Sequence, residues 1–374
     1  MTGVWRLWPV LALAIVISAL AADVWNHPEE MGIDFHTYEA ATRVGLQQGW
    51  SHIYDQGLVA AAQAALVPGE RTQPYLSPPT VAWLSVAVAA LPYGLAFYVW
   101  AVVMLAAFAL ALAWSASSRG LARWIAVGGA VAPYWVLKAV RVGQVVPLAA
   151  ASVVVAWRLV REDRQVAAGL ILSLILLKPN TAILVPFALL AAGRYRTFVA
   201  WAAAAAAVAV VAAVTLGPNG MTSYMSQLTG SLPPGADWLT LERAIGVNGV
   251  TALVSRLVIV GATLAAAFRL RSSPGIAMAV GILGSLLIAP YLHDSDLCLL
   301  SAAAFIVWEE RPAMMWRVPL VAVWLVATPF VAVSGMRPEL SLWTVVELGL
   351  LAALVVHAWR DVRPRARDRV GAAE

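Results

Sequence analysis

Asp34 is the first side chain in this sequence whose type and place suit chemistry at a membrane edge. It follows the first long apolar run, in the stretch "GIDFHTYEAA" (residues 32–41). A positioned carboxylate can act as a general base that accepts a proton from a hydroxyl group. Aspartate is also a favoured helix N-cap, and taken alone this is the preferred interpretation, because "FHTYEAA" is a helical pattern. Glu39, at i+5, need not share a face with Asp34, and we expect it to be solvated or paired with Arg43.

Two cations and an amide form a second candidate group in "KAVRVGQVVP" (residues 138–147). Lys138, Arg141 and Gln144 are spaced i, i+3 and i+6, which places them roughly along one side of a helix. Two cations beside an amide donor suit a phosphate group. Basic side chains also snorkel at helix ends, but snorkelling does not explain the glutamine. We therefore predict that Lys138 and Arg141 bind phosphate.

Lys178 lies in the middle of the apolar segment "GLILSLILLKPNTAILVPFALL". A lysine near the bilayer centre costs about 2.5–3.5 kcal/mol on insertion scales, so such a residue is by default functional or paired in a polar cavity. Pro179 and Asn180 follow it and predict a broken helix that lines a cavity. Lys178 is thus a third candidate for binding phosphate.

The late stretch "YLHDSDLCLL" (residues 291–300) places polar residues between two apolar runs. We predict that His293 binds a phosphate or a hydroxyl group, whereas Asp294 or Asp296 suits a helix cap. One histidine without a second one nearby is weak evidence for metal, and the single cysteine, Cys298, rules out a cysteine-rich site. We predict no metal and no cofactor, and the sequence has no nucleotide-binding loop.

Weaker candidates for contacts to a sugar or an acceptor are Tyr38, Tyr75, Gln144 and Glu39. Tyr75 opens "YLSPP" (residues 75–79), whose two prolines stiffen the chain. This stretch either starts a helix or shapes a cavity wall with the tyrosine exposed.

The composition shows which elements must position these residues. Of the 374 residues, 61% are hydrophobic and 12% are charged, whereas soluble proteins are about 45–50% apolar and about a quarter charged. Unbroken apolar runs of about 20 residues predict membrane-spanning helices rather than the short alternating strands of a barrel. The net charge of +5 lacks the aromatic and basic pattern of a nucleic-acid groove. We predict one all-α, polytopic membrane domain over residues 1–374, surrounded by membrane lipids and without a nucleic-acid partner.

The charges predict the topology, because Lys and Arg concentrate on the cytoplasmic side. A first extracytoplasmic loop over 23–75 would carry two interfacial helices, 217–248 would form a second such loop, and 359–374 a cytoplasmic basic tail. If "SSRGLAR" and "REDRQ" are cytoplasmic too, the number of crossings requires 77–92 or 166–192 to be re-entrant or broken, which is the arrangement we prefer. The alternative is twelve plain spans with the middle loops inverted. We expect about 11–13 transmembrane or re-entrant helices, with apolar runs near residues 4–22, 95–115, 123–139, 144–160, 166–192, 197–216, 249–269, 275–292, 295–308, 313–333 and 341–358.

Several short motifs occur in a fixed order: Asp-x-x-x-Tyr after the first run, then "IYD", "SPP", "RVGQ", "KP" and a late "HD". In this order they resemble the polyprenyl-phosphate-mannose-dependent mannosyltransferases of glycosyltransferase family 87, which have the GT-C fold. The resemblance extends over residues 30–300 or so.

This resemblance implies an integral enzyme of the plasma membrane with its active site on the extracytoplasmic side. The donor would be polyprenyl-phosphate-mannose and the acceptor a glycolipid of the phosphatidylinositol mannoside or lipomannan type. Asp34 matches the catalytic Asp of the family, and His293 corresponds best to its late His. Lys178 and Arg141 occupy family-like positions.

The chemistry agrees with this resemblance. A sugar phosphate already has a good leaving group, so transfer needs one base for the acceptor hydroxyl and cations for the departing phosphate. An in-line attack inverts the anomeric centre, and a β-linked donor would yield an α-mannoside. Two alternatives stay open: the same fold with a polyprenyl-phosphate-arabinose donor, and a non-enzymatic lipid or solute transporter with Lys178 as the counter-ion of its substrate.

Overall fold

The computed structural model describes residues 30–230, 239–327 and 340–360, together with the separate positions Ala14, Ser18 and Ala21. Within these residues all regular structure is helical, and no strand occurs. Apart from these three positions the predicted run over 4–22 lies outside the described residues, as do most of the basic tail and part of each predicted extracytoplasmic loop. The prediction of an all-helical, polytopic membrane protein is confirmed.

Among the described helices, four are long and apolar enough to cross a membrane: α5 (Tyr93–Ser115), α11 (Tyr195–Thr229), α13 (Gly249–Arg269) and most of α18 (Leu340–Arg360). The pair α6 (Leu121–Val131) and α7 (Tyr134–Val142) passes the same test together but bends by 61°. The bend lies at Pro133, whose own backbone is extended (φ −54°, ψ 140°) and which has no N–H to continue the helical hydrogen bonds. The apolar run predicted over 123–139 is therefore two helices.

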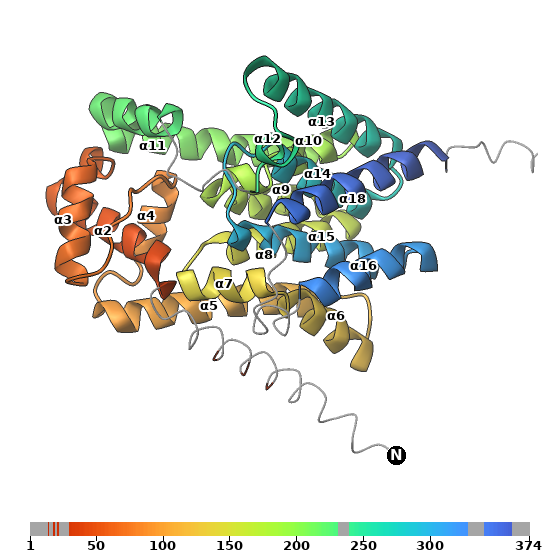
Figure 1. Ribbon diagram of the computed structural model, residues 1–374, viewed down its shortest axis with the longest axis horizontal. Coiled ribbons are helices and arrows are strands. Elements are labelled where there is room, and N and C mark those ends of the chain that lie inside the picture. The colour runs from red at the N-terminus through yellow and green to blue at the C-terminus, as the bar shows by residue number, and fades with distance from the viewer. Residues whose placement is uncertain are drawn as a thin grey trace, which may run out of the picture.

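The other predicted runs form shorter apolar helices, which pack between the long ones except for α16 at the edge of the molecule (Figure 1). They are α8 (Val146–Arg161), α9 (Gln165–Leu172), α10 (Leu184–Ala191), α14 (Pro274–Ile288), α15 (Cys298–Glu309) and α16 (Met314–Val326). A five-residue helix, α12 (Leu241–Ile245), precedes α13.

The predicted break at Lys178 is confirmed. After α9 the chain forms two short 3-10 turns, η4 (Ser173–Leu177) and η5 (Pro179–Thr181), and Lys178 between them is not helical. Gly169 of α9 lies against Thr197 and Trp201 near the start of α11, and α10 leads directly into that same helix. The segment 165–191 thus starts and finishes at one end of the molecule, with Lys178 at its turning point.

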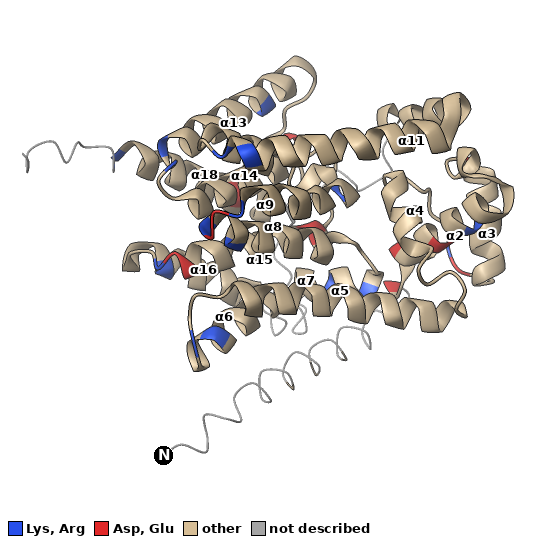
Figure 2. Ribbon diagram, turned by 180° about the vertical axis from the view of Figure 1, so that it is seen from behind, with Lys and Arg blue, Asp and Glu red and all other residues tan. Residues whose placement is uncertain are grey.

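Polar contacts join several helices at the end of the molecule where the segment 165–191 starts and finishes. The Glu309 carboxylate accepts hydrogen bonds from the backbone N–H groups of Ser117 and Ser118, at 2.6 and 3.0 Å. Arg158 at the end of α8 donates to the carbonyl of Trp114 at 2.6 Å. The C-terminal ends of α5, α8 and α15 therefore meet, and Figure 2 shows the charged residues mainly near helix ends.

The opposite end carries a layer of four short helices: α2 (Ile33–Gln48), η3 (Trp50–His52), α3 (Gln56–Leu66) and α4 (Pro79–Ser85) (Figure 1). The two helical patterns predicted in the first loop are thus confirmed. Pro79 stands at the first turn of α4, a position that tolerates its missing N–H, so "YLSPP" does start a helix. Tyr75 is buried rather than exposed, which corrects the interpretation of an open cavity wall.

Candidate functional site

Asp34 does not cap its helix. Gly32 is the N-cap of α2, and no side chain caps this end. The Asp34 carboxylate instead accepts a hydrogen bond from Nε2 of Gln144, 2.8 Å away, in the connection between α7 and α8. The side chain is partly exposed. The cap interpretation is therefore wrong, and the carboxylate is directed away from its own helix.

Gln144 joins Asp34 to Tyr38. While its Nε2 donates to the carboxylate, its Oε1 accepts a hydrogen bond from the Tyr38 hydroxyl at 2.9 Å. Tyr38 and Gln144 are both buried. Because the tyrosine hydroxyl donates to the amide oxygen, the amide nitrogen faces Asp34. The glutamine of "RVGQ" and the first-turn aspartate of α2, which are 110 positions apart, thus form one unit.

Gly143 allows this close approach. It ends α7 in the left-handed region, with φ of 78°, and the N–H of Gln144 returns to the carbonyl of Ala139. A Cβ atom at this glycine would lie 2.5 Å from the Cβ of Phe35 in α2. Neither the backbone angle nor the space admits a side chain.

Replacing Gly143 with alanine is therefore expected to lower the free energy of unfolding by about 1–3 kcal/mol. The midpoint of thermal unfolding of the purified protein in detergent measures this loss. Gly261→Ala is the matched control, because that position in α13 has open space, and alanine there should be neutral or slightly stabilising. Equal midpoints for both variants would contradict the packing described here.

Lys178 reaches the same region from the turning point between η4 and η5. It is 5% exposed, and its Nζ lies 3.3 Å from Oδ1 of Asp296. The ammonium also lies 5.8 Å from the centre of the Tyr291 ring. Asn180, two residues on, donates to the carbonyl of Tyr291 at 3.1 Å. The broken segment is thereby attached to the loop that carries His293.

His293 is exposed, immediately before the 3-10 turn η6 (Asp294–Leu297). Its backbone N–H donates to Oδ2 of Asp296 at 2.9 Å. Asp296 is fully buried. One carboxylate thus holds the Lys178 ammonium with one oxygen and the His293 backbone with the other. His293 and Lys178 therefore share Asp296 as a partner.

Burial and the charges of Lys178, His293 and Asp296 affect the pKa of Asp34. Burial raises the pKa of the Asp34 carboxyl above its ordinary value, and the nearby negative charge of Asp296 acts in the same direction. The charges of Lys178 and His293 and the hydrogen bond from Gln144 lower that pKa in part. The structure therefore brings Asp34, Gln144, Tyr38, Lys178 and His293 together.

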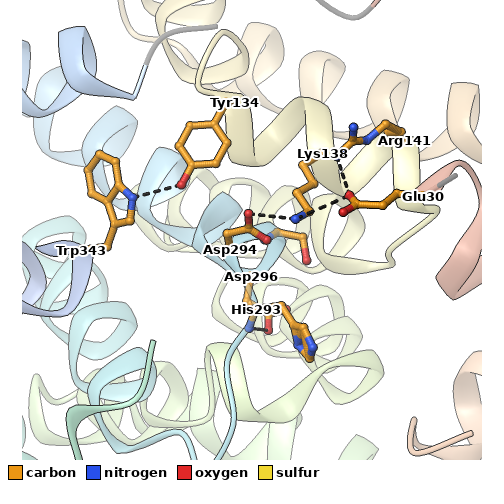
Figure 3. Close-up of polar contacts among 9 residues, drawn as sticks. Glu30, Tyr134, Lys138, Arg141, His293, Asp294, Asp296 and Trp343 are labelled. Carbon is orange, nitrogen blue, oxygen red and sulfur yellow. Dashed lines mark hydrogen bonds and ion pairs between the residues drawn. The ribbon is translucent and has the colours of Figure 1, made fainter. Parts of the chain in front are cut away.

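Lys138 and Arg141 lie beside this group, and both have carboxylate partners (Figure 3). Lys138 is 3.0 Å from Asp294 and 3.7 Å from Glu30, and Arg141 is 2.7 Å from Glu30. Whether either cation also touches a phosphate stays a prediction.

The two remaining candidates lie apart from the base. The rings of Tyr75 and Tyr38 pack edge to face, with their centroids 6.5 Å apart. The Tyr75 hydroxyl, however, donates to the carbonyl of Pro78. Glu39 is buried and accepts a hydrogen bond from Arg43 at 3.1 Å, in agreement with the predicted pair.

Sequence reasoning did not assign Glu30 a role and treated Asp296 only as a possible cap. Asp296 does accept the cap hydrogen bond from the backbone N–H of His293. The ion-pair partners of Glu30 and Asp296 lie more than 100 positions away, and only the folded chain shows them. Among the described residues, no group of three or more His, Cys, Asp or Glu side chains is arranged to hold a metal ion.

The chain has several helices that are long and apolar enough to cross a membrane. Asp34, Lys178 and His293 lie together at one end of these helices, so the fold is that of an integral membrane protein with a polar site. The chain belongs to glycosyltransferase family 87, whose family model matches residues 75–329. Gln144, Lys178 and His293 lie inside the matched region, whereas Asp34 precedes it. Neither a curated protein nor a solved structure matches the chain. The protein is therefore a membrane glycosyltransferase.

Proposed function

We propose that the enzyme transfers mannose from polyprenyl-phosphate-mannose to a hydroxyl group of a lipid-linked mannoside or glycan. The observation that carries this proposal is the Asp34 carboxylate, which is held by Gln144 and lies within electrostatic reach of Lys178 and His293. The transfer of an already activated sugar requires a base for the acceptor hydroxyl and groups that stabilise the departing phosphate, and Asp34, Lys178 and His293 suit these roles.

In the proposed step, the acceptor oxygen attacks the anomeric carbon of mannose while the bond from that carbon to the phosphate oxygen breaks. The hydroxyl proton passes to Asp34, and the electron pair of the broken bond leaves with the polyprenyl phosphate. Attack opposite the leaving group inverts the anomeric centre and gives an α-mannoside from a β-linked donor.

The leaving phosphate is assigned to Lys178 and His293. Lys178 is buried and held by Asp296, so its ammonium is preorganised and loses little freedom when it binds an anion. His293 is exposed on the adjoining loop and so remains accessible to a ligand. Tyr38 supports the base through Gln144 rather than by direct contact.

The site is proposed to face the outside of the plasma membrane. Arg158, Arg161 and Arg317 lie at or near the opposite end, where the ends of α8 and α15 meet. Basic residues concentrate on the cytoplasmic side. In this orientation the layer of α2, α3 and α4 lies outside the plasma membrane. The proposed donor is lipid-linked, so transfer on that side needs no nucleotide.

The test uses right-side-out membrane vesicles that contain the enzyme and either polyprenyl-phosphate-[14C]mannose or the corresponding arabinose donor. We expect label from the mannose donor in the lipids extracted into chloroform and methanol, and none from vesicles without the enzyme. Label from the arabinose donor alone would overturn the choice of sugar. Transfer from neither donor would overturn the proposed function.

A further inference from the structure

Four charged residues form a network next to the proposed site, which we call the four-charge network: Glu30, Lys138, Arg141 and Asp294 (Figure 3). Lys138 lies between the two carboxylates, at 3.0 Å from Asp294 and 3.7 Å from Glu30. Arg141 pairs with Glu30 at 2.7 Å. The Arg141 side chain is 0% exposed, and that of Asp294 is 13% exposed, so water screens these pairs less than it screens surface pairs.

The network joins three segments that are distant in the sequence. Glu30 lies just before α2, Lys138 and Arg141 lie on α7, and Asp294 begins η6. A backbone hydrogen bond strengthens one of these junctions, because the N–H of Gly32 donates to the carbonyl of Arg141 at 2.8 Å. The hydrogen bonds of Gln144 with Asp34 and Tyr38 join the first two segments as well.

Each of these segments carries a residue of the proposed site. Asp34 follows Glu30 on the first, Gln144 follows Arg141 on the second, and His293 precedes Asp294 on the third. A change in any pair of the network therefore shifts the base relative to the groups that face the donor phosphate. Misplacement by about 1 Å can reduce a rate by about 100-fold.

The charges of the network balance, with two cations against two carboxylates. If Lys138 or Arg141 turned toward a phosphate, Glu30 or Asp294 would lose its partner in a partly buried place, which is unfavourable. Lys178 is paired too, with Asp296, but that carboxylate also accepts a hydrogen bond from the backbone N–H of His293 and so keeps a partner when the ammonium binds phosphate. The sequence alone favoured phosphate binding by Lys138 and Arg141, and the structure shows that both cations already have partners.

We infer that Glu30, Lys138, Arg141 and Asp294 are positioning residues, which hold Asp34 and His293 at their working separation and do not bind the donor phosphate. This inference rests on the proposed function, because its readout is sugar transfer.

The experiment compares Asp294→Asn, Lys138→Met and the double variant, each purified and reconstituted in lipid with polyprenyl-phosphate-[14C]mannose and extracted membrane glycolipids. Each single substitution should lower kcat about 10- to 100-fold with little change in the donor KM. The double variant should be no worse than Lys138→Met alone, because that substitution already removes the pair with Asp294.

Arg158→Gln is the matched control. This arginine pairs with Glu162 at the opposite end of the molecule, so its loss should leave kcat unchanged. If Lys138 binds phosphate instead, Lys138→Met raises the donor KM, and Asp294→Asn, which frees the ammonium, keeps or increases the rate; this result would overturn the inference. A double variant in which the two single losses of kcat multiply would also overturn it, because Lys138 and Asp294 would then act independently. A wild-type enzyme without transfer would count against the proposed function and not against the network.

Discussion

Replacing Asp34 with asparagine is expected to reduce the rate of mannosyl transfer by about 10²- to 10⁴-fold, the usual contribution of a general base. Asparagine keeps the size of the side chain and its oxygen can still accept the hydrogen bond from Gln144. The acceptor hydroxyl then lacks a group that takes its proton. Because Asp34 is assigned no contact with the phosphate, the donor KM should change little. Initial rates of label transfer at several donor concentrations measure both quantities.

Asp55→Asn is the matched control for this substitution. Asp55 lies in the same layer of short helices and caps α3 through hydrogen bonds from Gly57 and Leu58. Asparagine caps helices about as well as aspartate, so transfer should be unaffected. A transporter that uses Lys178 as a counter-ion predicts the opposite outcome for Asp34→Asn: its activity would be largely retained.

Replacing Lys178 with methionine should abolish transfer and also destabilise the protein. The substitution leaves Asp296 as a buried carboxylate without its ammonium partner, and breaking a buried pair costs about 3–5 kcal/mol. The same substitution removes the cation assigned to the donor phosphate. Thermal unfolding in detergent and label transfer report on the two effects separately.

The double variant Lys178→Met with Asp296→Asn separates stability from function. It removes both charges, so much of the lost thermal stability should return. Transfer should stay absent, because no ammonium faces the phosphate. If the double variant recovers transfer together with stability, Lys178 is a structural residue and our assignment is wrong.

Much of the fold was predictable from the sequence, because lipid restricts the spanning elements to helices and the apolar runs are long. Pro179 beside Lys178 predicted the broken segment, and the pattern "FHTYEAATRVGLQQG" predicted α2. The sequence did not predict that α2 is buried for most of its length, with Phe35 packed on Tyr93 and Trp100 of α5. Helical spacing within one segment says nothing about which distant segments cover it.

The sequence indicated which residues belong to the candidate site but not which residues pair with one another. A lysine inside an apolar run is costly enough to attract attention on its own, and its partner Asp296 looked like an ordinary turn residue. Asp34 was favoured locally as a cap, and only the hydrogen bond from Gln144 reveals its direction. Lys138 and Arg141 had the spacing of a phosphate site, while their partners Glu30 and Asp294 come from segments far along the chain.

The most direct test of the central claim is an experimental structure of the enzyme with polyprenyl phosphate, the product of the donor. We predict that the phosphate lies within hydrogen-bonding distance of Lys178 and His293, with open space for the sugar between it and the Asp34 carboxylate. A phosphate bound far from both Lys178 and His293 would contradict the assignment of this site.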